Sequence, residues 1–459
     1  MKKVGFCAIS GSGMSALAQV LKYKGYEVLG SDRSFDQQKD LKNKQALTNI
    51  GIKLFPQNGS MVDENIEVLY ASTAVEDTIP DIKRAKELNI PIKQRSDLLA
   101  EIFSSHEHNI AVGGTSGKST VTAMIGYILD KSNLSPLVIN GALLKDYANQ
   151  EGIPNVILNN GTHCVIEADE SDGSIEKYTP YISVINNITL DHKSIDELKV
   201  LFGDFAQKAK YGAVINNDCP NSKDIIALHP NTKTFSITNP NSSFYASNIS
   251  SHPDGTLYTY DNTQYKLNLI GSFNVLNAMC AVACCSMLGI QPHQACNILS
   301  TFNGTKRRLE VLGKTSSNIT VIDDFAHNPD KVNASTSALK NYKGRLLIMF
   351  QPHGFSPMRL MGKEIIDSFV RHLSYDDVLL IPEIFFAGGT VKRDISSLDL
   401  VNYGNEKGIN AIFFDTRDQL KQYLLEIAQP NDRIVLMGAR DNSITDMGYE
   451  LLEKLKWAY

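Results

Sequence analysis

A glycine-rich turn between an apolar strand and a helix constrains this chain more than any other feature. The strand covers residues 110–112, and the helix runs from the turn to Leu129. Glycines at such a junction let backbone N–H groups point at a phosphate, while Lys118 can reach the β and γ phosphates and the Ser119 hydroxyl can ligate Mg²⁺. The residues expected around the phosphates are Gly114, Thr115, Ser116, Gly117, Lys118, Ser119 and Thr120. The common phosphate loop has glycine where Val112 stands, so the sequence predicts a shorter variant of that loop.

The order of the expected elements divides the chain into three α/β parts. At about 150 residues per domain, 459 residues suggest about three domains. Strands and helices alternate over the first hundred residues, which indicates a parallel sheet, and the pattern restarts after boundaries near residues 104–109 and 302–305. Residues 216–265 are rich in Asn, Ser, Pro and Asp and are expected to form hairpins and loops. We predict domains at 1–105, 106–304 and 305–459.

Composition and charge exclude several classes of protein. With 42% hydrophobic and 21% charged residues the chain is globular, and its formal net charge of −5 disfavours nucleic-acid binding through a broad basic surface. No apolar run approaches the roughly 18–20 residues that span a bilayer, and the N-terminus has no convincing cleavage site. We therefore expect a cytoplasmic protein that binds neither nucleic acid nor membrane. The seven cysteines form no CxxC pair, and Cys280, Cys284 and Cys285 are expected as buried thiols on an Ala-rich helix.

Acidic residues follow a second apolar strand at 164–168. Glu167, Asp169, Glu170 and Asp172 lie at its end, at the sheet edge where α/β proteins bind ligands. Packed carboxylates repel one another unless a cation is present, so Mg²⁺ beside the phosphate loop is the favoured interpretation and a solvated acidic turn is the alternative. The strand at 182–186 leads to His192 at the same edge, either as a ligand or as a structural histidine.

The N-terminal region carries a second glycine signature. Gly11, Ser12, Gly13, Met14 and Ser15 follow a strand at 4–9 and open a helix at 14–24, and Asp32 closes the next strand. This arrangement is typical of a diphosphate bound at a helix N-terminus, with the acid on a ribose hydroxyl. Alone it suggests a nicotinamide-dependent oxidoreductase. The second nucleotide loop argues against that function, because hydride transfer needs no ATP.

Taken together, these stretches resemble the Mur ligase family, ATP-dependent amide-forming enzymes of peptidoglycan synthesis, over essentially the whole chain. The loop at 114–119 marks the wider family. The stretches that are most similar to the branch joining UDP-N-acetylmuramate to L-alanine are residues 11–15, 31–32, 167–172, 274–278, 302–304 and 307–308. The resemblance implies a three-domain α/β architecture, with Rossmann-like N-terminal and C-terminal domains flanking a central P-loop ATPase-type domain.

The resemblance also implies roles for residues around ATP. Lys118 and Ser119 would hold the phosphates and one Mg²⁺. Glu167, with Glu170 as the alternative, and His192 would bind metal. Asn274 and Asn277 would lie at the adenine, Asp324 near the ribose, and Arg308 would reach the phosphates. The residues expected to act in catalysis are Lys118, Glu167, His192 and Arg308; the expected metal ligands are Ser119, Glu167 and His192.

The remaining expected contacts concern the two other substrates. In the family the N-terminal domain binds the UDP-sugar. A UDP-sugar also carries a ribose and a diphosphate, so the N-terminal glycine signature suits it as well as a dinucleotide. The substrate-binding residues implied are Gly11, Ser12, Gly13, Met14, Ser15, Asp32, Ser72, Thr73, Arg95, His327, His353 and Arg359. The reaction implied joins the carboxylate of UDP-N-acetylmuramate to L-alanine through an acyl phosphate. Attachment of a tripeptide or another amino acid, a binding module without ligase activity, and the oxidoreductase are the alternatives.

The departures from the family pattern cluster in the C-terminal part. His327 follows Ala326 where two histidines are usual in the L-alanine branch, and Gly354 stands where an arginine is expected after His353. The segment after residue 438 also differs from the usual short turn. These positions help to choose the incoming amine, so the identity of that amine is the least determined part of the prediction, and the sequence does not give the oligomeric state.

Overall fold

The computed structural model describes residues 2–72, 75–171, 173–190, 193–386, 392–439, 441 and 443–456. The chain folds into two compact units. The first comprises Met1–Asn248, Tyr258–Leu267 and Val275–Thr305, and the second comprises Ile249–Leu257, Asn268–Asn274 and Lys306–Tyr459. The first unit therefore contains most of the two domains predicted at 1–105 and 106–304, and the three-domain boundaries stay a prediction.

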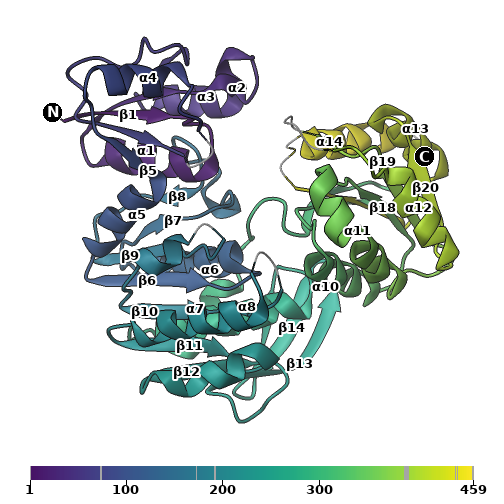
Figure 1. Cartoon of the computed structure of the whole chain (residues 1–459). Helices are drawn as coiled ribbons and strands as arrows, with labels where there is room; N and C mark the ends of the chain where they lie inside the picture. The colour runs from purple at the N-terminus through teal and green to yellow at the C-terminus, as the bar shows by residue number, and fades with distance from the viewer. Residues whose placement is uncertain are drawn as a thin grey trace. The chain divides into compact units, whose positions relative to one another are not determined.

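A five-stranded parallel sheet with helices packed against it begins the first unit (Figure 1). In spatial order its strands are β3 (Lys53–Phe55), β2 (Glu27–Ser31), β1 (Lys3–Cys7), β4 (Val68–Ala71) and β5 (Ile92–Gln94). Its helices are α1 (Ser12–Tyr23), α2 (Arg33–Asp36), α3 (Leu41–Asn49), α4 (Pro80–Glu87) and α5 (Arg95–Ser104). The apolar face of α1 is buried against this sheet, which places the glycine turn before α1 at the carboxyl ends of the strands.

The central sheet has ten strands and positions the phosphate loop. In spatial order they are β15 (Thr263–Leu267), β14 (Gly255–Tyr260), β13 (Phe244–His252), β12 (Thr232–Ser236), β11 (Gly212–Asn216), β10 (Ile182–Ile185), β6 (His108–Gly113), β9 (His163–Glu167), β7 (Leu137–Ile139) and β8 (Val156–Ile157). The strand β6 lies between β10 and β9 in parallel register, with Ile185 opposite Gly113 and Glu167 opposite Val112. Residues that follow these three strands therefore meet at one edge of the sheet.

The helices of the central region are α6 (Lys118–Lys131), α7 (Ile195–Gln207), α8 (Ser272–Ser286) and α9 (Pro292–Leu299), with 3-10 turns at Lys145–Tyr147, Ser174–Lys177 and Pro220–Leu228. The segment 216–265 contains four strands, including the predicted hairpins. All seven cysteines are free and buried, and the thiols of Cys280, Cys284 and Cys285 lie on α8 as predicted.

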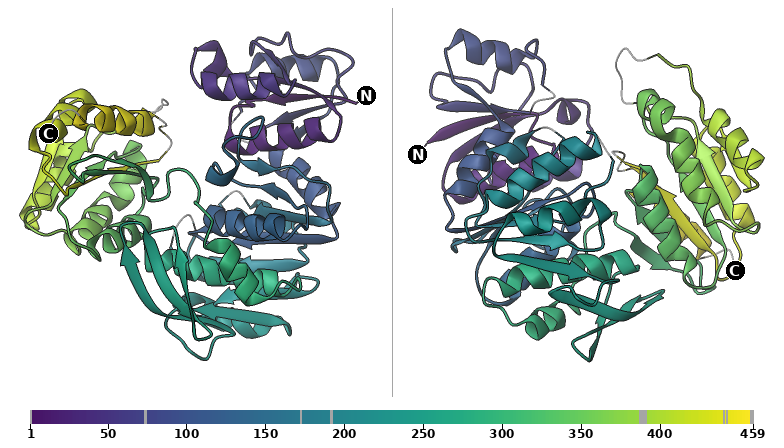
Figure 2. Two further views of the ribbon diagram at one scale, coloured as in Figure 1. Left: turned by 180° about the vertical axis from the view of Figure 1, so that it is seen from behind. Right: turned by 60° about the horizontal axis from the view of Figure 1, so that its bottom comes forward.

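The second unit is built on a six-stranded sheet. Its order is β16 (Glu310–Lys314), β17 (Thr320–Asp324), β21 (Arg433–Met437), β18 (Leu346–Phe350), β19 (Val378–Pro382) and β20 (Ala411–Phe414), with β16 antiparallel and the others parallel. One face packs against α10 (Pro329–Lys340), α11 (Phe355–Val370) and α12 (Ser397–Glu406), and the other against α13 (Arg417–Ile427) and α14 (Ser443–Leu455) (Figure 2). Both faces are covered, so the unit is doubly wound.

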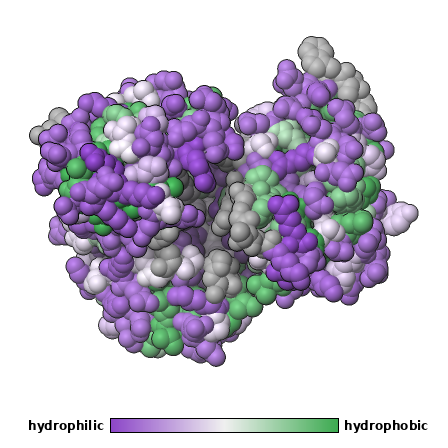
Figure 3. Space-filling view, turned by 45° about the horizontal axis from the view of Figure 1, so that its top comes forward, coloured by the Kyte–Doolittle hydropathy of each residue, from purple (hydrophilic) through white to green (hydrophobic). Residues whose placement is uncertain are grey.

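The surface agrees with the composition. On the face drawn in Figure 3 most described residues are hydrophilic, and the apolar ones form separate patches. Over the described ranges, no helix combines the length and apolarity needed to cross a membrane.

The buried His163, stacked on His108, makes stability depend on pH. The rings of His108 and His163, opposite each other on β6 and β9, stack with centroids 5.0 Å apart. Burial and the neighbouring His108 lower the pKa of His163 below its ordinary value of 6.5. As the pH falls, His163 of the unfolded chain therefore takes up a proton before His163 of the folded chain, and the stability of the fold should fall as the pH falls through about 6.5.

The variant His163→Gln tests this origin of the pH dependence. Denaturant unfolding should be measured near pH 7.5 and near pH 5.5. The free energy of unfolding should decrease less between these two pH values in His163→Gln than in the unchanged protein; an equal decrease would contradict a role of His163.

Candidate active site

The phosphate loop joins β6 to α6 through two left-handed glycines. Gly114 has φ +127° and Gly117, the N-cap of α6, has φ +83°. Because Gly117 has no side chain, none caps the first turn, and the N–H groups at the start of α6 keep the direction that suits an anion. The helix itself is almost entirely buried, so the loop stands on a rigid support.

Lys118 lies across this loop. Its Nζ donates to the carbonyl oxygen of Gly114 and to Glu170 Oε2, both at 2.7 Å. The Glu170 side chain is 2% exposed and that of Lys118 is 17% exposed, so the pair is largely shielded from water. A shielded, hydrogen-bonded ion pair fixes the direction of the ammonium group, although desolvation offsets much of its attraction. Glu170 is thus engaged by Lys118.

Glu167 lies beside the hydroxyl expected at magnesium. Ser119 Oγ donates to Glu167 Oε2 at 3.0 Å, and the Gly141 N–H donates to Glu167 Oε1 at 2.5 Å. Mg²⁺ is commonly held by one or two protein oxygens together with phosphate oxygens and water. Ser119 and Glu167 fit that donor set, and their adjacency favours Glu167 over Glu170 as the metal ligand. Within the described part of the chain no group of three acidic, cysteine or histidine side chains could hold a metal by itself. The predicted ligand His192 lies outside the described residues.

Asp169 is influenced by the charges of two cationic groups. Burial alone would raise its pKa, but hydrogen bonds from Ser171 and the charges of Lys118 and Arg95 hold the pKa of Asp169 below its ordinary value. The carboxylate is therefore ionised, and it experiences both the lysine of the phosphate loop and an arginine of the N-terminal sheet region.

The N-terminal glycine signature brings a helix N-terminus and an arginine together. Gly11 is the N-cap of α1. A Cβ atom on Gly13 would lie 2.9 Å from Arg95 Cδ and 3.1 Å from its Nη1, so the guanidinium passes over the start of α1. A helix N-terminus and a guanidinium both favour an anion. Ser12 opens α1, whereas Met14 and Ser15 are buried on the helix, where Ser15 Oγ donates to the Ser12 carbonyl.

Asp32 is already engaged by the chain. Its Oδ2 accepts from the Ser10 N–H at 2.8 Å, and its Oδ1 accepts from the Ser34 N–H at 2.8 Å and hydroxyl at 2.7 Å. These bonds cap α2 and fix the turn after β1, a structural use that weakens the interpretation of Asp32 as a ribose acid in an oxidoreductase. Ser72 follows β4 at the same edge, and Thr73 lies outside the described residues.

The two predicted asparagines of α8 have different surroundings. Asn277 is buried, and its Oδ1 accepts from Asn186 Nδ2 at 3.0 Å. Asn274 is also buried, and its Nδ2 donates to the Ile270 carbonyl at 2.9 Å. Asn277 therefore lies beside the phosphate loop, whereas this bond of Asn274 fixes the start of its own helix.

In the second unit, two adjacent arginines lie near Phe325. Arg307 is buried and donates to the Gly438 carbonyl at 2.6 Å and to Asp323 Oδ1 at 3.3 Å. Both guanidinium groups also lie over the Phe325 ring, with the Arg307 carbon 5.2 Å and the Arg308 carbon 4.8 Å from its centre. Arg307 thus anchors the turn, which favours Arg308 as the arginine that reaches a ligand, and that role stays a prediction.

Asp324 and His327 lie on either side of Phe325 in the chain. Burial raises the pKa of Asp324, opposed by a hydrogen bond from Ser335 and by the charge of Arg308. His327 Nδ1 lies 2.9 Å from the Phe325 carbonyl, and its ring meets Phe325 edge to face. Arg308 and His327 therefore both contact the Phe325 ring, and the charge of Arg308 acts on Asp324.

The last two predicted substrate residues are engaged locally. His353 packs against Phe385, with ring centroids 5.3 Å apart. Arg359 donates Nε to Asp394 Oδ1 at 2.9 Å and Nη2 to the Lys392 carbonyl at 2.9 Å. The guanidinium of Arg359 is thus directed at the segment before α12, and its role at a substrate stays a prediction.

The sequence did not single out several residues at these edges. Asn186 and Asn187 contact the phosphate loop from the end of β10, and the Gly141 N–H binds Glu167. Arg417 donates to Gln351 Oε1 at 2.7 Å and pairs with Asp441 at the end of the C-terminal sheet. The signal that the sequence offered for the two asparagines was their position directly after a predicted strand; that this strand neighbours β6 is known only from the structure.

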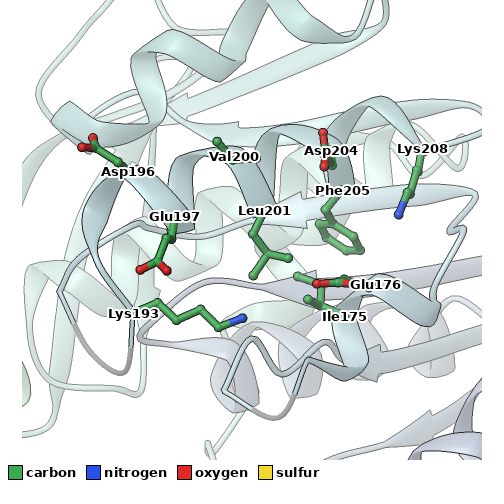
Figure 4. Close-up of a pocket in the computed structure, with 10 residues that line it drawn as sticks. All are labelled: Ile175, Glu176, Lys193, Asp196, Glu197, Val200, Leu201, Asp204, Phe205 and Lys208. Atoms are coloured by element: carbon green, nitrogen blue, oxygen red, sulfur yellow. The ribbon is translucent and has the colours of Figure 1, made fainter.

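A separate cavity of about 600 Å³ lies between α7 and the 3-10 turn at Ser174–Lys177 (Figure 4). Its lining residues are Ile175, Glu176, Lys193, Asp196, Glu197, Val200, Leu201, Asp204, Phe205 and Lys208. None of them belongs to the predicted site. Four carboxylates against two lysines also oppose an anionic ligand such as ATP.

Comparison with known proteins agrees with this geometry. Three family descriptions match in succession: "Mur ligase family, catalytic domain" over residues 3–107, "Mur ligase middle domain" over 112–285 and "Mur ligase, glutamate ligase domain" over 307–440. The UDP-N-acetylmuramate–L-alanine ligase of Dictyoglomus turgidum is 33% identical over 99% of this chain and 97% of its own length.

Two solved structures share the fold. The UDP-N-acetylmuramate–alanine ligase of Thermotoga maritima has a TM-score of 0.82 at 23% identity, covering 100% of both chains. The murein peptide ligase of Psychrobacter arcticus has a TM-score of 0.69 at 20% identity, covering 100% of this chain and 99% of its own. With a family relative above 30% identity over nearly the whole length, the predicted fold class is confirmed, and the chain belongs to the Mur ligase family of ATP-dependent ligases.

Proposed function

We propose that this enzyme joins the carboxylate of UDP-N-acetylmuramate to L-alanine in peptidoglycan precursor synthesis, with ATP converted to ADP and phosphate. The observation that carries the proposal is the pairing, at one sheet edge, of Lys118 with Glu170 and of Ser119 with Glu167. This arrangement suits phosphoryl transfer from ATP, and the relatives matched over the full length are named for this reaction.

The proposed reaction explains why positive charge is needed beside the phosphate loop. A substrate carboxylate that attacks the γ phosphate is an anion approaching an anion, so Lys118 and the α6 N-terminus must offset the repulsion. The attack gives an acyl phosphate, and the amine then displaces phosphate from the acyl carbon. Mg²⁺ held by Ser119 and Glu167 would neutralise charge on the phosphates. We also propose Arg308 as a further cation that reaches the phosphates.

We also assign the two other substrates to separate regions of the chain. We assign the UDP-sugar to the α1 N-terminus and Arg95, and the amine to the C-terminal sheet edge near His327 and His353. A cytoplasmic location is part of the proposal, since seven free buried thiols suit a reducing compartment. Gly354, in place of the expected arginine, favours one second candidate, a ligase of the same class that attaches another amino acid or a tripeptide.

Phosphate release across a panel of amines tests the proposal directly. With UDP-N-acetylmuramate and ATP present, L-alanine should give the fastest release among L-alanine, glycine, L-serine and the tripeptide. Dependence on both sugar and amine identifies the ligase. Faster turnover with the tripeptide would transfer the function to the second candidate, and release indifferent to every amine would reject both.

Lys118→Ala should separate the ATP site from the sugar site. Loss of the ammonium removes a cation from the transferring phosphoryl group, so ligation should fall by about 100-fold or more. Binding of UDP-N-acetylmuramate, measured by calorimetry, should change little, because the α1 N-terminus and Arg95 are untouched. Equal loss of both would contradict the assignment of substrates to sites.

Glu167→Gln and Glu170→Gln form a matched pair for the metal. Glu167→Gln weakens an oxygen ligand, so the Mg²⁺ concentration for half-maximal activity should rise by about tenfold or more. Glu170→Gln removes the partner of Lys118 and should lower turnover with less effect on the Mg²⁺ requirement. The reverse pattern in a Mg²⁺ titration would make Glu170 the ligand.

A further inference from the structure

Two side-chain amides from the end of β10 hold one peptide of the phosphate loop. The carbonyl oxygen of Ser116 accepts from Asn186 Nδ2 at 2.9 Å and from Asn187 Nδ2 at 3.0 Å. The Ser116 N–H donates to Asn187 Oδ1 at 2.8 Å. The carboxamide of Asn187 thus binds both the N–H and the carbonyl of Ser116, and the amide of Asn186 donates a second hydrogen bond to the same carbonyl.

Further contacts fix the position of Asn187 against the loop. Its Oδ1 also accepts from Thr115 Oγ1 at 2.8 Å, and its backbone carbonyl accepts from the Thr115 N–H at 3.2 Å. A Cβ atom on Gly114 would lie 3.0 Å from the Asn187 backbone nitrogen and 3.1 Å from its backbone oxygen. The loop therefore packs directly on the chain that continues β10.

Asn186 extends these contacts to α8. Its Nδ2 donates to Asn277 Oδ1 at 3.0 Å, and its backbone carbonyl accepts from Asn216 Nδ2 at 2.7 Å. A Cβ atom on Gly117 would overlap Asn186 Nδ2 and come within 2.9 Å of Asn277 Oδ1. Asn186 is 3% exposed and Asn277 5% exposed, so breaking their bond costs buried polar atoms a partner.

The position of the Ser116 peptide controls the anion site. Gly117, the next residue, is the N-cap of α6, so a rotation of the peptide before it would redirect the first N–H groups of the helix. We propose that Asn186, Asn187 and Asn277 form an amide clamp that positions the phosphate loop, and that Asn277 acts on ATP through Asn186. The proposal deepens the proposed function, since it rests on the ATP site at this loop.

The clamp differs from the role that the family resemblance implies for Asn277. A residue that reads adenine affects only ligands that carry the base. A residue that positions the loop affects any triphosphate, including one without a base. Inorganic tripolyphosphate with Mg²⁺ is therefore the deciding probe, used as a competitor of ATP on the full chain.

The experiment compares Asn186→Ala, Asn187→Ala and Asn277→Ala. Each variant loses between one and three of the hydrogen bonds described above, which should weaken both Mg²⁺·ATP and Mg²⁺·tripolyphosphate by about tenfold. Asn186→Ala and Asn277→Ala share one bond, so the double variant should lose less affinity than the two single losses combined. UDP-N-acetylmuramate affinity should stay unchanged and shows that each variant is folded.

Asn109→Ala is the matched control. Asn109 is also buried and lies on β6, but near its opposite end, where Nδ2 donates to the Phe103 carbonyl and Oδ1 accepts from the Tyr181 N–H. It should lower stability and leave polyphosphate affinity unchanged.

Three results would overturn the clamp. They are unchanged tripolyphosphate affinity in Asn187→Ala, loss of ATP but not tripolyphosphate affinity in Asn277→Ala, and equal loss in Asn109→Ala. The binding readouts need no turnover. If the variants behave as expected but no amine supports phosphate release, the proposed function fails and the clamp stands.

Discussion

Placement of a few positive charges beside two anionic ligands is the constraint on which the rest of this structure depends. The whole chain carries a formal charge of −5, so attraction for ATP must come from local groups. The N-terminus of α6 supplies one such group and Lys118 the other. Glu170 keeps the ammonium group oriented in a shielded position, where an isolated charge would be costly. The ion pair with Glu170 thus sets the direction of the Lys118 ammonium group within the site.

The topology of the central sheet makes that organisation possible. Since β10, β6 and β9 are neighbours in parallel register, their carboxyl ends deliver amides, the phosphate loop and carboxylates to one edge. Asn186 and Asn187 arrive from one side of the loop and Glu167 and Glu170 from the other. The left-handed glycines let the loop approach these neighbours closely, because a side chain at Gly117 would occupy the space of Asn186.

The parts of the site that sequence could predict are those whose residues are adjacent in the chain. The loop, its lysine and the acidic run are local patterns with a direct chemical meaning. The asparagines after β10 were missed because their role depends on strand order, which the sequence does not state. Arg307 and Arg308 look equivalent as a charged run, and only the burial of Arg307 against Asp323 and Gly438 separates them. In the same way, the sequence could not show that Asp32 is engaged by Ser10 and Ser34, which gives the acid after the glycine fingerprint a structural use.

The amine site that we propose lies in a different unit from the phosphate loop. In the second unit, the loops after β21 and β18 turn toward opposite faces of the sheet, which is where doubly wound folds bind ligands. The departures from the family pattern gather at this edge: Gly354 replaces the expected arginine, with φ +76° at the start of α11, and Arg417 pairs with Asp441 nearby. These positions belong to the second unit, whereas the phosphate loop belongs to the first. On the proposed assignment of the amine to this edge, substitutions here should change which amine is accepted without altering how the carboxylate is activated.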